Sequence, residues 1–185
     1  MGTNIQAVGM IEFNSIAVGM EAADRMVKAA SVELLLLKTI CPGKFLVGVH
    51  AGVAAVQASV ETGLALAGET TVDHFVIPNI HPDVIKAMSC AIEEIMGDAL
   101  GVIETFSAAS SILAADLAIK AANVSLIEVR IAMGLGGKAF CTLSGDVASV
   151  DSAVKAGSAA VAENGLLVRK AVISNIDPQV LRHIM

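Results

Sequence analysis

The chain contains one sequence pattern twice, and this duplication limits the folds open to it. The stretch AVGMIEFNSIAVGMEAADRMVKAASVEL, from Ala7, aligns without a gap with ALGVIETFSAASSILAADLAIKAANVSL, from Ala99, at an offset of 92 residues. Farther on, GKFLVGVHAGVAAVQASVETG matches GKAFCTLSGDVASVDSAVKAG at an offset of 94, and VIPNIHPDV matches VISNIDPQV at 96. Two copies of about 90 residues are too few and too long for a solenoid. The repeat therefore predicts two copies of one domain, at residues 1–96 and 97–185.

Each copy alternates segments with strand and helix patterns. In the first copy we predict strands at 7–14, 32–40, 45–49 and 71–77, and helices at 15–30, 53–67 and 82–96. Ser15 is predicted to cap the first helix through its hydroxyl. The apolar stripe of this helix is predicted to comprise Ile16, Met20, Ala23, Val27 and Ala30. The second copy repeats the order, so each copy is predicted to form a compact βαββαβ domain of the α+β class with a terminal helix.

Composition and charge exclude several classes of protein. Hydrophobic residues make up 55% of the chain but aromatic residues only 3%, which predicts a core of small side chains and enough apolar surface to favour oligomers.

The net charge of -6, with Lys and Arg scattered singly, argues against nucleic-acid binding. The longest uncharged run, residues 45–60, is shorter than the roughly 20 apolar residues of a membrane span. The start of the chain lacks a signal-peptide pattern, and three cysteines are an odd, sparse set, so we expect a cytoplasmic protein.

Several of the repeated motifs are those of a known family. In the first copy they are GMIE, AADRMVKAASVELL and GKFLVGVHAGVAAVQASVETG, and in the second GVIE, AADLAIKAANVSLIEV and GDVASVDSAVKAG. Together they resemble the bacterial microcompartment (BMC) shell domain. The resemblance implies two tandem ferredoxin-like BMC domains in a chain that assembles as a pseudohexameric homotrimer and tiles with other shell proteins. The stretches KTICPGKF and NIHP are most similar to the T-type tandem shell proteins of propanediol-utilisation microcompartments, which hold an iron–sulfur cluster at the trimer centre.

The resemblance also implies roles for two sets of residues. The turn between the second and third strands of each copy lines the central pore of the family. In this chain the pore-lining positions are Cys41, Pro42, Gly43, Met133, Gly134, Leu135, Gly136 and Gly137. The family's edge lysine, which forms the lateral contact in the shell, corresponds to Lys28 and Lys120. Single-domain members usually have Pro-Arg-Pro-His after the last strand, whereas this chain has PNIHP and SNIDP there, so no arginine stands at that edge and the lateral contact is expected to differ in detail.

Cys41 is the candidate metal ligand. One thiol cannot hold a cluster, but three symmetry copies around a trimer axis would ligate three irons of a [4Fe-4S] cluster and leave the fourth open. Met133 stands at the matching position of the second copy, so a trimer offers three thiols rather than six. Pro42 is expected to stiffen the turn and Gly43 to let its backbone approach the cluster. Amide donors near Gly43 and Lys44 are expected to offset the cluster's negative charge.

Plainer interpretations stand beside this one. A single cysteine in a turn is by default an unliganded thiol. Cys141, between Phe140 and Thr142, is predicted to be a small core residue, and Cys90 a structural one. Glu12 and Glu104 match between the copies, and we expect them to make contacts within the fold rather than to act as an acid/base pair. The GLGGK stretch at 134–138 lacks the rest of a phosphate-binding motif and indicates a turn or pore lining.

Three functions follow from these observations. The leading one is a shell protein, not an enzyme, with a [4Fe-4S] cluster at its centre for electron transfer or cluster exchange, and with encapsulated redox enzymes as further partners. The second is a metal-free shell protein whose centre is a pore for small metabolites. The third, of another class, is an oligomeric regulatory domain that binds a small molecule.

Overall fold

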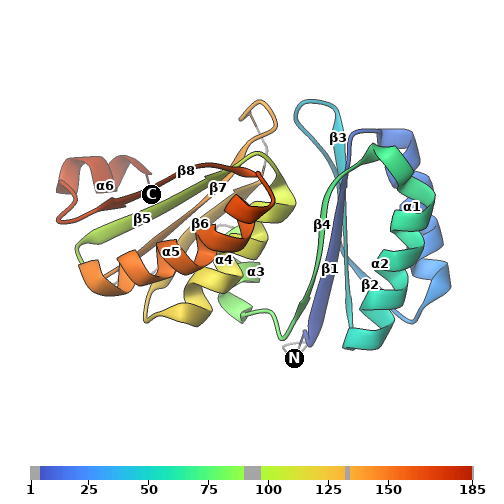
Figure 1. Cartoon of the computed structure of the whole chain (residues 1–185), viewed down its shortest axis with the longest axis horizontal. Helices are drawn as coiled ribbons and strands as arrows, with labels where there is room; N and C mark the ends of the chain where they lie inside the picture. Colours follow the sequence, from blue (N-terminus) through green and yellow to red (C-terminus); the bar gives the residue numbers. More distant parts are fainter. Residues whose placement is uncertain (1–4, 90–96, 132–133, 185) are drawn as a thin grey trace. The chain divides into compact units, whose positions relative to one another are not determined.

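The computed structural model describes residues 5–89, 97–131 and 134–184. The chain forms two compact units, Met1–Ile80 with Ala132–Gly137, and His81–Ile131 with Lys138–Met185. Unit 1 contains β1 (Ala7–Phe13), α1 (Ile16–Ala29), β2 (Glu33–Ile40), β3 (Lys44–Ala51), α2 (Val53–Ala67), a 3₁₀ turn (Gly68–Thr70) and β4 (Thr71–Pro78). Unit 2 contains α3 (Pro82–Met88), β5 (Ala99–Thr105), α4 (Ala108–Ala121), β6 (Ser125–Ile131), β7 (Ala139–Gly145), α5 (Val147–Glu163), β8 (Leu167–Ile173) and α6 (Pro178–Ile184). Each unit holds one copy of the predicted βαββαβ order (Figure 1).

Each unit is one antiparallel sheet with two helices packed on one face (Figure 1). The strand order is β2-β3-β1-β4 in unit 1 and β6-β7-β5-β8 in unit 2. In unit 1 the core between sheet and helices includes the fully buried Ile11, Met26 and Val47. Gly19 lets α1 approach the sheet closely, because a Cβ at this position would come within 2.5 Å of the Phe45 ring. The α+β tandem fold predicted from the repeat is confirmed.

The predicted cap of the first helix is confirmed. The Ser15 hydroxyl accepts the backbone N–H of Val18 at 3.4 Å, and in α4 the Ser107 hydroxyl accepts that of Ser110 at 2.9 Å. A hydroxyl acceptor in this position satisfies one of the N–H groups that a helix start leaves without a partner. The duplicated serine therefore marks the same helix start in both copies.

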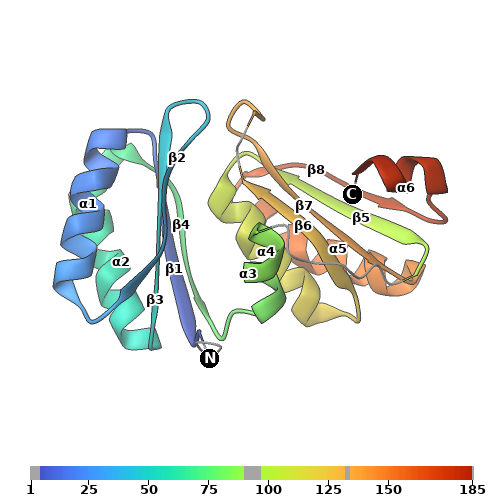
Figure 2. The ribbon, with the colours of Figure 1, turned by 180° about the vertical axis from the view of Figure 1, so that it is seen from behind.

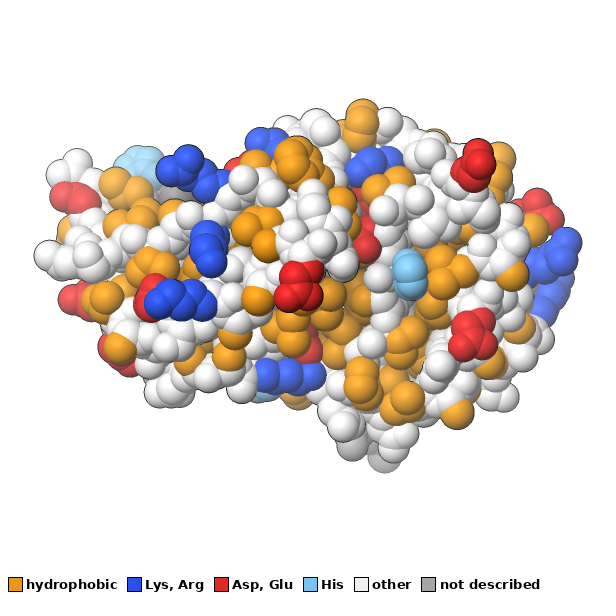
Figure 3. All heavy atoms as spheres, viewed as in Figure 1, with side chains coloured by type: hydrophobic (Ala, Val, Ile, Leu, Met, Phe, Trp, Pro, Cys, Tyr) orange, Lys and Arg blue, Asp and Glu red, His pale blue; other side chains and the backbone are white. Residues whose placement is uncertain are grey.

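The predicted apolar stripe of α1 is largely wrong. Of its five residues only Ala23 is buried, whereas Met20 is 55% and Val27 38% exposed. The face that α1 packs against the sheet consists of Gly19, Ala22, Ala23 and Met26. Small residues favour this face because they allow a close approach to the sheet. Met20 and Val27 point away from the core, so apolar side chains of α1 remain exposed, and Figure 3 shows apolar side chains on the surface.

Helix α3 packs in unit 2 although it follows the last strand of the first copy. It contacts β6 and α4, and it lies beside them in Figure 2. The helix predicted at 82–96 covers Pro82–Met88, and residues 90–96 lie outside the described part of the chain. The predicted join between residues 96 and 97 falls at the end of that gap and stays a prediction. None of the helices in the described residues is long and apolar enough to cross a membrane.

Candidate functional site

The turn between β2 and β3 presents Cys41 to solvent. Cys41 is a free, exposed cysteine at the end of the hairpin, and the Cys41–Pro42 peptide bond is cis. The N–H of Gly43 donates to the carbonyl of Ile40 at 3.1 Å, which closes the turn, and the φ of Gly43 is +84°. The Gly43 N–H is therefore used within the turn, and the contribution of amide donors near Gly43 and Lys44 to a cluster stays a prediction. The thiol, in contrast, is accessible to a ligand.

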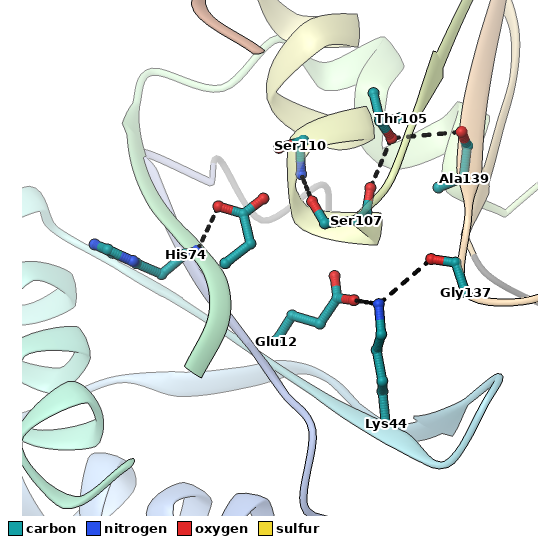
Figure 4. Close-up of polar contacts among 9 residues, drawn as sticks. Glu12, Lys44, His74, Thr105, Ser107, Ser110, Gly137 and Ala139 are labelled. Atoms are coloured by element: carbon teal, nitrogen blue, oxygen red, sulfur yellow. Dashed lines mark hydrogen bonds and ion pairs between the residues drawn. The ribbon is translucent and has the colours of Figure 1, made fainter. Parts of the chain in front are cut away.

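Glycine residues of the matching turn in the second copy lie in the same unit as Cys41. Gly137 is buried with a φ of +90°, and a Cβ there would come within 2.8 Å of Pro42 Cδ. Its carbonyl accepts a hydrogen bond from Lys44 Nζ at 3.4 Å (Figure 4). Gly134 and Gly136 are exposed. The structure therefore brings the end of the second predicted pore turn next to the first.

The two remaining positions of the predicted pore lining are Leu135 and Met133. Leu135 is half-buried, and Met133 lies outside the described residues. A pore forms only in an assembled particle, so the pore lining as a whole stays a prediction.

A buried ion pair anchors the strand that follows the Cys41 turn. Lys44 Nζ lies 2.8 Å from Glu12 Oε1, and the Glu12 side chain is fully buried while that of Lys44 is 16% exposed (Figure 4). Lys138 and Glu104 form the equivalent pair in unit 2 at 2.6 Å, with side chains 45% and 32% exposed. A buried carboxylate needs such a partner. The contacts within the fold that were expected for Glu12 and Glu104 are confirmed, although no sequence pattern indicated that lysines would make them.

Substitution of Lys44 by methionine is expected to destabilise the protein strongly. Breaking a buried ion pair from one side leaves the other charge buried, which typically costs about 3 kcal/mol. Lys138→Met is the matched control, because its pair is exposed and should be worth under about 1 kcal/mol. Urea unfolding followed by far-UV circular dichroism measures both. Equal losses in the two variants would show that the Glu12 carboxylate does not depend on Lys44.

Cys141 is confirmed as a core residue. It is fully buried on β7, and burial raises the pKa of its thiol to about 12. This buried thiol is not accessible to a ligand at the surface of the chain, in contrast to Cys41. Cys90 lies outside the described residues, and its predicted structural role stays a prediction.

Comparison with known proteins now identifies the family. The sequence profile of the BMC domain matches residues 7–80 and 99–176, which cover the two βαββαβ copies. The chain belongs to the BMC-domain family. It is 49% identical over 168 residues to the bacterial microcompartment shell protein PduT of Citrobacter freundii, covering 91% of each chain. It is also 39% identical over 92 residues to the shell protein PduA of Salmonella typhimurium, which covers 48% of this chain and 97% of PduA.

A solved structure agrees with this assignment. The crystal structure of a microcompartment protein from Desulfitobacterium hafniense superposes with a TM-score of 0.83 at 50% sequence identity, covering 96% of this chain and 99% of the other. The predicted family is therefore confirmed: the chain is a tandem-domain BMC shell protein similar to PduT.

The two lysines at the family's edge position differ in environment. Lys28 is 73% exposed and pairs with Asp24 at 2.7 Å. Lys120 is 37% exposed and pairs at 2.6 Å with Asp116, whose side chain is only 2% exposed. Each lysine lies in the last turn of its helix, where a cation is favourable. Their lateral contact with other shell proteins stays a prediction.

The donor set of this BMC chain fits an iron–sulfur cluster only in an assembly. Among residues 5–89, 97–131 and 134–184, no three His, Cys, Asp or Glu side chains gather as a metal site. Cys41 and Cys141 are the free cysteines in these ranges, and only the first is exposed. A cubane cluster takes thiolate ligands from the protein. The described part of one chain therefore contributes one accessible thiol, and a three-fold arrangement of chains would supply three copies of it.

Proposed function

We propose that the chain is a structural shell protein, not an enzyme, which forms pseudohexameric homotrimers that tile with other shell proteins. It would act in the cytoplasm as part of the wall of a bacterial microcompartment. The tandem BMC fold supports this role, because three chains supply six BMC domains to one ring. The relatives PduT and PduA are both microcompartment shell proteins. Exposed apolar residues on α1, β2 and α6 favour association over an isolated chain.

A [4Fe-4S] cluster at the three-fold axis is the second part of the proposal. The observation that carries it is the exposed Cys41 thiol, which stands once per chain at the end of a hairpin. Three such thiolates would ligate three irons and leave the fourth open to a small ligand. When bound, the cluster supplies one-electron transfer, or is itself exchanged through the shell, with encapsulated redox enzymes as partners.

The residues around Cys41 position its thiol. The Gly43–Ile40 hydrogen bond closes the turn, and the Lys44–Glu12 pair fixes the strand directly after it. Gly137 packs against Pro42 from the side of the second turn. A ligand held on a fixed backbone loses little freedom when it binds, so these contacts favour a cluster with one defined orientation.

A metal-free pore is the second candidate. Gly134 and Gly136 support it, because they are exposed and a Cβ at either position would meet nothing within 4 Å. Such open turns leave room for a small metabolite to pass. The regulatory-domain alternative has less support, because the relatives named above are shell or microcompartment proteins.

Sedimentation of anaerobically purified protein tests both parts of the proposal. The chain has no Trp or Tyr, so the protein is followed by peptide-bond absorbance and the cluster by visible absorbance. We expect one particle of three times the 18.9 kDa chain mass, with the visible signal sedimenting at the same rate. A stable monomer or a hexamer of chains would refute the trimer. A colourless trimer without iron or sulfide would refute the cluster and favour the open pore.

A further inference from the structure

The last residue of the second pore turn lies against the Cys41 turn. Gly137 is buried in unit 1, although it comes from the second copy of the repeat. A Cβ at this position would come within 2.8 Å of Pro42 Cδ, 3.5 Å of Lys44 Nζ and 3.6 Å of the Cys41 carbonyl oxygen. The backbone at residue 137 is therefore close to three residues in or next to the turn that carries the candidate ligand.

Lys44 adds a polar link between the two turns. Its Nζ donates to the carbonyl of Gly137 at 3.4 Å and lies 2.8 Å from Glu12 Oε1 (Figure 4). Lys44 begins β3 directly after the Cys41 turn, and its side chain is 16% exposed. The ammonium group is therefore held from two sides, by β1 through Glu12 and by the second turn through Gly137.

Position 137 requires glycine for two separate reasons. Its φ of +90° lies in the left-handed region, which residues with a Cβ rarely adopt, and a Cβ would also collide with Pro42. Gly134 and Gly136 share the first property, with φ values of +72° and +62°, but a Cβ at either of them would meet nothing within 4 Å. The lack of space is therefore specific to Gly137 among the three glycines of this turn.

The equivalent glycine of the first copy does not repeat this close packing. At the offset of 94 residues Gly137 corresponds to Gly43, and a lysine follows each of them. Gly43 has a similar φ of +84°, yet a Cβ there would meet nothing within 4 Å. The two glycines thus share a backbone conformation but not a set of neighbours, so the packing against Pro42 is a particular property of the second turn.

Pro42 connects this contact to the thiol. Its Cδ is bonded to its own backbone nitrogen, because the proline side chain closes into a ring with the backbone. That nitrogen forms the peptide bond with Cys41. A displacement of Pro42 Cδ therefore moves the backbone directly after Cys41, whereas the free end of a flexible side chain could move alone.

We infer that Gly137 is a positioning residue for the Cys41 thiol. It holds Pro42 in place from the second turn, so both turns of a chain are needed to present one ligand. The tandem duplication then contributes more than a second turn without a cysteine, because that turn supports the first. Loss of a group that orients a metal ligand typically costs about 10- to 100-fold in metal affinity. This inference deepens the proposed cluster and rests on it.

Gly137→Ala tests the inference, with Gly136→Ala as the matched control. Both variants place a Cβ at a positive φ in the same turn, but only the first drives it into Pro42. Both should remain trimers in sedimentation velocity. In anaerobically prepared protein we expect Gly137→Ala to lose iron to a ferrous chelator at least about ten-fold faster than the wild type. Its reduced cluster should also have an altered electron paramagnetic resonance spectrum, while Gly136→Ala should match the wild type in both measurements.

Amide hydrogen exchange of the iron-free protein is a readout that depends neither on the cluster nor on the trimer. The Gly43 N–H, which donates to the Ile40 carbonyl, reports whether the Cys41 turn stays closed. We expect exchange in the peptide that spans this turn to be faster in Gly137→Ala and to keep the wild-type rate in Gly136→Ala.

The outcomes separate the inference from the proposed cluster. Unchanged exchange in Gly137→Ala, equally fast exchange in both variants, or faster exchange without faster loss of iron would overturn the inference. A wild-type trimer without iron would instead refute the cluster. The exchange comparison would then decide by itself whether the second turn supports the first.

Discussion

Replacement of Cys41 by serine is expected to remove all iron from the trimer. The three proposed ligands are copies of one residue, so a single substitution removes every protein ligand of the cluster at once. The serine hydroxyl is harder and far less easily deprotonated than a thiol, so it should not replace the thiolate. Iron and sulfide should fall from about four each per trimer to background in anaerobically prepared protein.

The trimer itself should survive this substitution. Cys41 is exposed at the end of a hairpin, and the Gly43–Ile40 hydrogen bond that closes the turn involves only the backbone. Sedimentation should therefore give the wild-type mass without the visible absorbance. That combination separates the loss of a ligand from the loss of the assembly.

Two further cysteine variants serve as controls. Cys141→Ala and Cys90→Ser should both keep wild-type iron. Alanine is preferred at 141 because that side chain is fully buried, and a serine hydroxyl there would need a hydrogen-bond partner. Wild-type iron in Cys41→Ser would refute the cluster site. Loss of iron in the Cys90 variant alone would move the ligand to a residue that we interpret as structural.

The fold was predictable because the sequence pattern of each strand and helix occurs twice, once in each copy of the repeat. A strand or helix pattern that recurs at the matching position of the second copy does not arise by chance. The helix predicted at 53–67, for example, has the same bounds in the structure. The serine cap was also predictable, because it depends only on residues within one turn of the helix. Local chemistry of this kind can be inferred without knowledge of distant neighbours.

Burial across elements was harder to predict. The stripe of α1 was misassigned because Met20 and Val27 are apolar yet point away from the sheet. The counterpart of α1 in the second copy, α4, contacts α3, a helix that the sequence order assigns to the first copy. The exposure of a residue depends on which segment covers it, and periodicity within one helix carries no information about that segment.

The candidate site was only partly predictable from one chain. The position of Cys41 in a turn follows from the Pro-Gly that comes after it. The Lys44–Glu12 pair was missed, because the two residues are 32 positions apart and nothing in either local pattern indicates the contact. The proposed ligand set consists of symmetry copies of a single thiol, so the spacing of residues within one chain cannot reveal it.

Reversal of charge at the edge lysines is expected to abolish shell sheets while trimers remain. The double variant Lys28→Asp and Lys120→Asp changes the edge position in both copies, so every lateral contact that uses it is altered. Facing edges would then repel one another, and each new aspartate would also lie at a helix end that favours a cation. Electron microscopy should show sheets for the wild type and separate particles for the variant.

The structure indicates a refinement of this experiment. Lys120 pairs with the buried Asp116, so Lys120→Asp would leave that carboxylate without its cation and weaken unit 2. Lys28→Asp combined with Lys120→Gln avoids this effect, because the glutamine amide can still donate to Asp116. Lys155→Asp is the matched control, since Lys155 is 68% exposed and pairs with Asp151 at 2.6 Å in the same i,i+4 arrangement. If the control forms sheets and the refined variant does not, the edge assignment is supported. Normal sheets from the refined variant would show that neither lysine forms the lateral contact.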